Sequence, residues 1–562
     1  MIKIVECVPN FSEGCDQNVI DAIADAVKSV NGVALLDVDP GKATNRTVFT
    51  FAGSPEVVLE AAFQAIKKGC ELIDMRHHKG EHARQGACDV CPFVPVSNVT
   101  MDECVELAKR LGKRVGEELD IPVYLYAEAA QIPERKKMPD IRVGEYEALE
   151  EKLKKPEWKP DFGPAEFRPK AGVITTGARK FLIAYNINLN STNTKLAKEI
   201  AFTIRENGRL KKDADGNTVI GQDGKKEREP GLFKHVQATG WLIPEYNRAQ
   251  VTMNILDIDE TPLHLVYDKC CELATNLGCR VTGSEIVGMV PKQVMTEAGL
   301  YFLKKQGSTR GVTEEEIIRN AMITLGLNDV APFDPKEKII ERRFEMNRPL
   351  IAMTCEKFCA ELSSNSPAPG GGSVAALSGA LSTALSSMVA SLTFDKKGFE
   401  KVKPEMEKAG MEAQKILKEQ LEAIDDDTFA FNKVMDSFSM PKGTDEQKAK
   451  RASAIQEATK NATLVPLNTL KRTIPSLKLA LEVVEKGNPN SLSDSGVAAL
   501  TAEAAANGAY YNVMINLASI DDKKWVKKTK DEAVKYLGEA AQLAEKIKSE
   551  MMKKLEAGLK KI

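Results

Sequence analysis

In Phe181-Leu-Ile-Ala-Tyr-Asn-Ile-Asn-Leu189, every second side chain is large and apolar. A period of two is typical of a β-strand with one face in a hydrophobic core. The residues that follow predict, in order, a helix over 194–207, strands over 234–241 and 250–257, a helix over 263–277 and a strand over 281–287. This β-α-β-β-α-β order is that of the ferredoxin-like fold. We therefore expect an α/β subdomain of this kind over residues 181–330.

The chain before this stretch also alternates between strands and helices. Strands are predicted over 2–8, 33–38, 47–51, 91–96 and 123–127, and helices over 16–30, 55–68 and 101–119. With an insertion after the second helix, their order fits the same fold. Prolines and glycines exclude regular structure over 158–172. We expect a first α/β subdomain, also ferredoxin-like, over residues 1–180.

The composition changes after the second subdomain. Residues 331–350 contain prolines and many charges, which predicts a linker, and residues 351–562 have helical periodicity throughout. Residues 374–394 carry no charge and are long enough to span a bilayer. They are mostly small, however, which favours a closely packed bundle helix and no membrane span. Pro466 and Pro475 predict helix breaks. We expect an all-helical domain whose exposed apolar faces pair in a homo-oligomer.

The overall composition excludes some classes of function. The formal net charge of -2 gives no field that would attract nucleic acid. Lysines gather over residues 523–530, where a solvated helix face is expected in preference to an anion-binding surface. The chain has 11 cysteines, an odd number, which indicates reduced thiols and a cytoplasmic location.

Three of the five histidines lie in one short run, Ile73-Asp-Met-Arg-His77-His78-Lys-Gly-Glu-His82. Imidazole exchanges protons near neutral pH, so this run predicts acid–base catalysis. His78 to His82 also matches the H-x-x-E-H pattern of zinc proteases. Gly80 and the surrounding cationic side chains oppose a helical zinc site, and a set of surface histidines is a further alternative. We favour a loop that carries one free acid–base imidazole.

Two motifs flank this loop in sequence. Asp37-Val-Asp39 lies where a strand is predicted to end, a position from which Asp39 could orient an imidazole; a turn is the alternative. Cys88-Asp-Val-Cys91 has no second C-x-x-C to complete a four-thiolate zinc site, so a buried structural pair is expected.

Two motifs in the helical half could bind or catalyse. Gly370, Gly371, Gly372 and Ser373 precede an apolar helix, so their N–H groups could bind an anion or a polar ring, although a plain linker fits equally well. In Asp425-Asp426-Asp427 the three carboxylates face different directions around a helix. One of them is expected to face the bundle with a raised pKa, and a solvated acidic face is the alternative.

Taken together, these segments resemble the formiminotransferase-cyclodeaminase family. The motifs that carry the resemblance are Val5-Glu-Cys-Val-Pro-Asn-Phe-Ser-Glu-Gly14, Leu36-Asp-Val-Asp39, Thr44-Asn-Arg-Thr47, His78-Lys-Gly-Glu-His82, Asp89-Val-Cys-Pro92, Gly144-Glu-Tyr-Glu-Ala148, Asp161-Phe-Gly-Pro164, Thr176-Gly-Ala-Arg-Lys-Phe-Leu-Ile-Ala184 and Ala368-Pro-Gly-Gly-Gly-Ser-Val374. The resemblance implies transfer of the formimino group from N-formimino-L-glutamate to tetrahydrofolate, followed by closure to 5,10-methenyltetrahydrofolate with release of ammonia.

The resemblance also implies roles for particular residues. The transferase catalyst falls on His82 and the cyclodeaminase aspartate on Asp427, with Asp425 left open as an alternative. Folate contacts fall on Gly163, Pro164, Ala165, Glu166, Phe167, Arg168, Pro169, Lys170, Ala171 and Gly172. Asp39 is then expected to steady the His82 ring.

The resemblance further implies a ring-like homo-oligomer, polyglutamylated folate as substrate, and no metal. Two competing hypotheses are a metal-dependent hydrolase that uses His78 and His82, and a folate-binding scaffold with only one activity retained.

Overall fold

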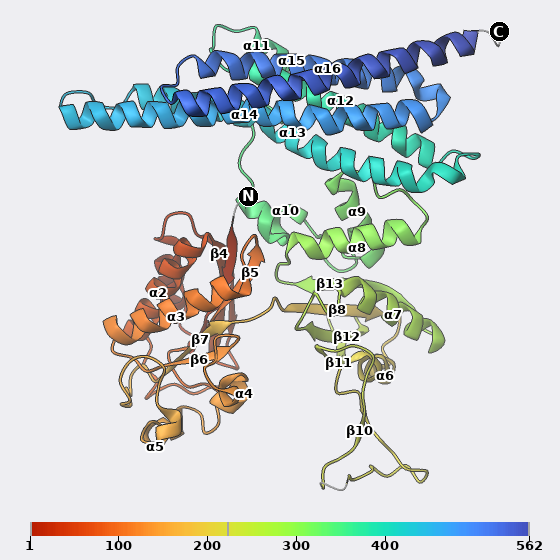
Figure 1. Ribbon diagram of the computed structural model, residues 1–562. Helices are drawn as coiled ribbons and strands as arrows, with labels where there is room; N and C mark the ends of the chain where they lie inside the picture. Colours follow the sequence, from red (N-terminus) through yellow and green to blue (C-terminus); the bar gives the residue numbers. More distant parts are fainter. Residues whose placement is uncertain (1–2, 222–223, 560–562) are drawn as a thin grey trace. The chain divides into compact units, whose positions relative to one another are not determined.

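The computed structural model describes residues 3–221 and 224–559, so the outermost positions of the predicted first and last domains lie outside it. The chain forms two compact units. One contains residues 1–299 and 320–345, and the other contains residues 300–319 and 346–562. The first unit holds two separate α/β sheets, and the second is rich in long helices (Figure 1). The expected order of two α/β parts followed by a helical part is therefore confirmed.

The first sheet has seven strands. They are β1 Ile4–Cys7, β2 Asn10–Phe11, β3 Ala34–Gly41, β4 Arg46–Gly53, β5 Cys88–Ser97, β6 Val123–Ala127 and β7 Ile174–Ala178. β1 and β2 both lie between β4 and β5 and are antiparallel to both. β3 pairs with β4, while β7 and then β6 continue the sheet from β5 in parallel. The strand β7 was not predicted, because all five of its residues are buried and none alternates.

One face of this sheet is covered by helices. α1 Gln17–Lys28, α2 Pro55–Leu72 and α3 Met101–Glu118 bury a core built around Phe11, Phe49, Phe51 and Phe93. The other face carries a smaller apolar cluster with α4 Met138–Ile141 and α5 Leu149–Leu153, and leaves polar side chains uncovered at its edge. This second face holds the first candidate site.

The second sheet follows the order that the sequence predicts. Its elements are β8 Ile183–Leu189, α6 Thr194–Ile204, β11 Val236–Ile243, β12 Arg248–Ile255, α7 Leu263–Asn276 and β13 Val281–Val287. The strand order is β11-β12-β8-β13, antiparallel throughout. Between α6 and β11, β9 Arg209–Leu210 and β10 Arg228–Glu229 form the base of a long polar hairpin.

The segment expected to be a linker contains structure. After α8 Lys292–Lys305 and α9 Glu314–Leu325, the chain forms α10 Pro335–Lys338 and a 3₁₀ turn, Ile340–Phe344. Ile339 pairs with Val290, and both Ile339 and Ile340 are buried. The first half of residues 331–350 therefore packs as part of the α/β unit.

The helical unit is built around one helix of small residues. Its helices are α11 Cys355–Leu362, α12 Gly371–Phe394, α13 Lys403–Phe438, α14 Asp445–Lys486, α15 Leu492–Leu517 and α16 Lys523–Leu559. α12 packs against α13, α14 and α15. It buries Gly372, Gly379, Ser386 and Thr393 at seven-residue spacing, so that α13 can approach closely. A Cβ at Gly379 would lie 2.7 Å from the Gln420 amide nitrogen on α13.

Among the described residues, α12 is the one helix long and apolar enough to cross a membrane. Within its most apolar window, however, 61% is buried inside the helical unit. Core helices of bundles have the same length and composition, so this burial agrees with the bundle interpretation.

The predicted breaks at Pro466 and Pro475 do not occur. α14 runs from Asp445 to Lys486 with both prolines inside it. Pro466 has no N–H to donate to the carbonyl of Ala462 four residues earlier. Asn516 on α15 donates its side-chain amide to that carbonyl instead, at 3.0 Å. A neighbouring helix therefore replaces the hydrogen bond that proline removes.

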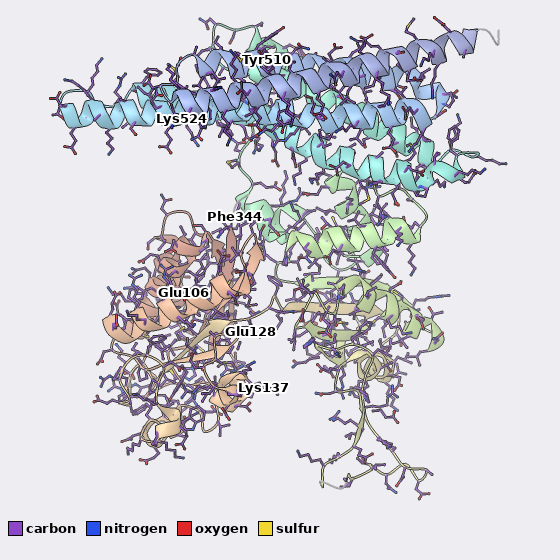
Figure 2. The ribbon with its side chains drawn as sticks, in the orientation of Figure 1. Glu106, Glu128, Lys137, Phe344, Tyr510 and Lys524 are labelled. Atoms are coloured by element: carbon purple, nitrogen blue, oxygen red, sulfur yellow. The ribbon has the colours of Figure 1, made fainter. Side chains whose placement is uncertain are left out.

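The lysines at the start of α16 point into solvent, as expected. Lys523, Lys524, Lys527, Lys528 and Lys530 are all exposed, and Figure 2 places Lys524 at this end of the helix.

Candidate active sites

The histidine run forms a loop that follows α2, and its first histidines are not free bases. His78 Nε2 lies 2.8 Å from the backbone oxygen of Asn45, and Arg84 Nε donates to His78 Nδ1 at 3.2 Å. His77 is largely exposed. A Cβ at Gly80 would lie 2.2 Å from the oxygen of Thr44, so only glycine allows the loop to pass there. With both nitrogens engaged, His78 has none left for a metal, and the hydrolase hypothesis gains no support.

One ring nitrogen of His82 is engaged in a hydrogen bond, and the pKa of the ring is lowered. Its Nδ1 lies 2.7 Å from the oxygen of Ala83 and 3.1 Å from Arg46 Nη1. When Nδ1–H donates to Ala83, Nε2 keeps its lone pair and can accept a proton. Partial burial and the nearby Arg46 charge lower the pKa of His82 below its ordinary value. This shift favours the neutral ring, which is the form that can act as a base.

A buried charge cluster holds Arg46 against this ring. Arg46 donates to Asp89 Oδ2 at 2.8 Å and, through Nε and Nη2, to Asn10 Oδ1 at 3.0 and 2.8 Å. Arg142 also pairs with Asp89, whose side chain is fully buried. The β2–β5 register passes from Asn10↔Val90 to Phe11↔Cys88 and skips Asp89. This bulge turns the carboxylate toward the two arginines.

Asp39 was expected to steady the His82 ring, and the structure shows no direct bond between the two among the described residues. Asp39 is exposed on β3 and pairs with Val48, which also pairs with Asn10, so Asp39 and Asn10 share a sheet face. In the described parts of the chain, no hydrogen bond or ion pair joins Asp39 to His82. Ala83 accepts the hydrogen bond from Nδ1–H, and Arg46 lies beside the same ring atom as a cation. Sequence reasoning missed Arg46, although it lies in the quoted motif Thr44-Asn-Arg-Thr47.

The predicted folate stretch, residues 163–172, is a loop tied to the histidine loop. Gly163 and Gly172 at its ends have φ of +77° and +71°, which favour glycine. Met75 N–H donates to the oxygen of Lys170 at 3.0 Å, and Ala87 N–H donates to the oxygen of Ala171 at 2.8 Å. The folate stretch and the segment of the histidine loop, which lie about 80 residues apart in sequence, are thus joined by backbone hydrogen bonds.

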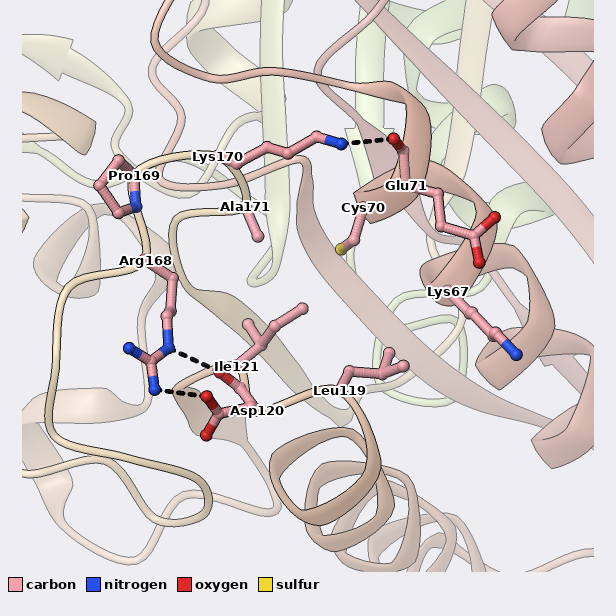
Figure 3. A pocket seen from close by; sticks show the side chains of 10 residues that line it. All are labelled: Lys67, Cys70, Glu71, Leu119, Asp120, Ile121, Arg168, Pro169, Lys170 and Ala171. Carbon is pink, nitrogen blue, oxygen red and sulfur yellow. Dashed lines mark hydrogen bonds and ion pairs between the residues drawn. The ribbon is translucent and has the colours of Figure 1, made fainter.

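The second half of this loop lines a pocket of about 380 Å³ at the ends of α2 and α3 (Figure 3). Arg168 pairs with Asp120, and Lys170 Nζ donates to the backbone oxygen of Glu71 at 2.6 Å. The pocket is lined by Lys67, Cys70, Glu71, Leu119, Asp120, Ile121, Arg168, Pro169, Lys170 and Ala171. Apolar walls with a few charged groups at the rim are typical of a small-molecule site.

A second, polar cavity of about 440 Å³ adjoins the histidine loop. Lys79, Gly80 and Arg84 form one side, and residues 144, 145 and 147 form the other. Arg84 donates to Glu147 at 2.7 and 2.9 Å. With this pairing Arg84 also donates to His78, which leaves His82 as the candidate acid–base group of the loop.

In the helical unit, the three adjacent aspartates have three different environments. Asp425 is fully buried and accepts the backbone N–H groups of Leu350 and Ile351 at 2.9 and 3.1 Å. Asp426 accepts from Arg348 at 2.9 Å. Asp427 has no cationic partner among the described residues. Asp425 therefore stabilises the backbone at residues 350–351. This leaves Asp427 as the candidate catalytic residue.

The carboxylate of Asp427 lies against the glycine loop at the start of α12. A Cβ at Gly372 would lie 2.1 Å from Asp427 Oδ1, so this contact requires glycine. Ser373 donates its backbone N–H to Asp427. The Ser373 hydroxyl donates to the backbone oxygen of Ile424 at 2.8 Å and lies 3.5 Å from Asp427 Oδ2. Burial nevertheless raises the pKa of Asp427 above its ordinary value. Gly372 and Ser373 of this loop thus meet Asp427, two features that were expected separately from the sequence.

Three family models match the chain along nearly its whole length. Residues 4–179 match the formiminotransferase domain, N-terminal subdomain, residues 184–345 match the formiminotransferase domain, and residues 354–535 match formiminotransferase-cyclodeaminase. The formimidoyltransferase-cyclodeaminase of Rattus norvegicus is 45% identical over 544 residues, which are 96% of this chain and 97% of that protein. The chain belongs to the formimidoyltransferase-cyclodeaminase family.

Shorter relatives match parts of this family member. The glutamate formimidoyltransferase of Thermoplasma acidophilum is 43% identical over 312 residues, which are 55% of this chain and 95% of that protein. The methenyltetrahydrofolate cyclohydrolase of Methylorubrum extorquens is 41% identical over 194 residues, 34% of this chain and 93% of that protein. Chains of about these lengths therefore exist as separate proteins.

The histidine loop of this family member does not form a metal-binding group. Among the described residues, the three side chains close enough to share an ion are His235, Asp257 and Glu260 in the second α/β subdomain. Lys180 already pairs with Asp257 at 2.6 Å, and Lys234 pairs with Glu260 at 3.3 Å. Each of the two carboxylates is thus ion-paired with a lysine.

Proposed function

We propose that the chain is a bifunctional folate enzyme of histidine degradation. It transfers the formimino group of N-formimino-L-glutamate to N5 of tetrahydrofolate and then closes the product to 5,10-methenyltetrahydrofolate. The observation that carries this proposal is that each unit contains one acid–base side chain that is partly buried, contacts its neighbours and has a shifted pKa. His82 lies in the α/β unit, and Asp427 in the helical unit.

In the transfer step, N5 of tetrahydrofolate attacks the formimino carbon and loses its proton. His82 Nε2 accepts that proton, because burial and the Arg46 charge lower the pKa of the ring and favour its neutral form. The tetrahedral intermediate then breaks its bond to the nitrogen of glutamate, which leaves as an amine after His82 returns the proton. One ring thus acts first as base and then as acid. Arg46, held by Asp89, is the positioning residue in place of Asp39.

In the closure step, N10 attacks the carbon of the protonated formimino group, N5–CH=NH₂⁺, and the formimino nitrogen leaves as ammonia. Asp427 takes the N10 proton and delivers it to the departing nitrogen. All five histidines precede residue 265, so the helical unit has no imidazole for this task. A carboxylate with a raised pKa is the available relay.

Folate binding is assigned to the loop of residues 163–172. Its link to the histidine loop through Met75 and Ala87 supports this assignment, since the folate nitrogen must reach His82. The pocket lined by Arg168 and Lys170 would receive part of a polyglutamylated tetrahydrofolate (Figure 3). Removing these cations should raise KM for folate and leave KM for formiminoglutamate unchanged.

The remaining expectations extend the proposal. Both α/β subdomains are ferredoxin-like, supported by the strand order of the second sheet. The domains are residues 1–180, 181–330 and 351–562. Residues 331–350 connect the last two, and the first half of this segment packs on the α/β unit. The enzyme needs no metal, works in the cytoplasm and assembles as a homo-oligomeric ring. Exposed apolar side chains on α12 and α15, among them Leu392 and Ile515, support the assembly.

The test is to mix the protein with formiminoglutamate and tetrahydrofolate and to follow glutamate, ammonia and methenyltetrahydrofolate separately. The proposal predicts that all three form in equal amounts. Glutamate without ammonia would show that the second activity is absent, and no glutamate would contradict the proposal as a whole.

A further inference from the structure

A second polar side chain reaches the glycine loop from α15. A Cβ at Gly371 would lie 3.3 Å from Asn512 Nδ2 and 3.9 Å from Asn512 Oδ1. Asn512 thus faces the glycine next to the one that Asp427 contacts. One turn away, a Cβ at Gly508 would lie 3.2 Å from the Cβ of Ala375, so the lack of a side chain there also lets α15 come close to α12.

The orientation of the Asn512 amide is fixed by its own helix. Nδ2 donates to the backbone oxygen of Gly508 at 2.8 Å. A carbonyl partner requires the NH₂ end of the amide, so Oδ1 must be the atom that turns away from Gly508. In the described part of the chain no donor reaches Oδ1. The half-buried amide therefore offers a neutral acceptor beside the loop.

We propose that Asn512 is a catalytic residue of the cyclodeaminase site, with Oδ1 accepting a hydrogen bond from the nitrogen that leaves as ammonia. The inference rests on the proposed function. The bond forming is N10 to carbon, and the bond breaking is carbon to the amino nitrogen. As that nitrogen gains a proton from Asp427, its hydrogen bond to Oδ1 becomes charge-assisted and strengthens. An interaction that strengthens along the reaction raises kcat more than it lowers KM.

The test compares two asparagines on the same helix. Asn507 makes the same bond, from Nδ2 to the oxygen of Glu503 at 2.9 Å, but lies five residues earlier and on another face of α15. Asn512→Ala should lower kcat for ammonia release about 10- to 100-fold, the effect of losing a hydrogen bond to a charged group. Asn507→Ala should stay within about twofold of wild type, because it loses only a comparable helix-surface bond.

A third variant separates a catalytic role from a structural one. Asn512→Asp adds a negative charge near Asp427, which should raise the pKa of the Asp427 carboxyl. The acid limb of the pH profile for ammonia release should therefore move to higher pH. Glutamate release by the same protein samples should not change. The urea midpoint of the helical unit, measured on the same samples, reports whether the unit that contains Asn512 is folded.

Two results would overturn the inference. One is wild-type ammonia release from Asn512→Ala, and the other is an unshifted profile for Asn512→Asp. If wild-type protein itself releases no ammonia, the proposed function fails, not the assignment of Asn512.

Discussion

Gly372→Ala sets two opposing effects against each other. Alanine is the better helix former, which would stabilise α12 by up to about 1 kcal/mol. The added Cβ would lie 2.1 Å from Oδ1 and 2.4 Å from Cγ of Asp427, and overpacking of this kind costs about 1–3 kcal/mol. Since the second effect is larger, the helical unit should lose about 0–2 kcal/mol of stability. The carboxylate of Asp427 must move away.

The catalytic consequence should exceed the loss of stability. A displacement of about 1 Å in a catalytic group can cost 100-fold in rate. We therefore expect ammonia release to fall by about 100-fold or more. Glutamate release should be unchanged, because His82 lies in the other unit.

Gly370→Ala is the matched control within the same loop. The nearest atom to its added Cβ is the oxygen of Pro367, at 3.8 Å, an ordinary contact. Because alanine is a weaker N-cap than glycine, this variant loses no more than about 1 kcal/mol of stability and keeps its ammonia release. Separate assays of ammonia and glutamate decide the matter. Wild-type ammonia release from Gly372→Ala, or equal losses in both variants, would refute the placement of Asp427.

Three further predictions follow from the two sites. Arg46→Met removes a charge that, together with burial, holds the pKa of His82 low, so the acid limb of kcat/KM for transfer should move to higher pH; an unmoved limb would contradict the assignment. Asp425→Ala leaves the N–H groups of Leu350 and Ile351 unbonded, at a cost of about 1–3 kcal/mol, and should lower the urea midpoint of the helical unit while folded molecules still release ammonia. Stripping metals with a chelator should leave both rates intact, and recovery only on adding zinc would disprove the metal-free mechanism.

Much of the fold follows from local pattern. The alternation of residues 181–189 and the helical periods around it predict the second subdomain in the right order, because each element buries one face. β7 was missed because a strand buried on both faces has no period. The continuity of α14 through Pro466 could not be foreseen, since the replacement bond comes from Asn516, 50 residues later.

The site was predictable where one motif held the chemistry, and not where segments meet. The imidazole of His82 and the loop Gly370–Ser373 are visible as motifs. The contact between Arg46 and Asp89 depends on a β-bulge between β2 and β5, and a bulge cannot be predicted from a local sequence pattern. The three adjacent aspartates are equivalent in sequence. Residues 348–351 distinguish them by occupying Asp425 and Asp426.

The central claim is that two independent proton relays, one in each unit, act on the same one-carbon group. The most direct measurement is glutamate and ammonia release by His82→Ala and Asp427→Asn, each given formiminoglutamate and tetrahydrofolate, and each given 5-formiminotetrahydrofolate. The account predicts that His82→Ala releases no glutamate yet cyclises the supplied intermediate. Asp427→Asn should release glutamate and accumulate the intermediate. Ammonia release by Asp427→Asn at the wild-type rate would contradict the account.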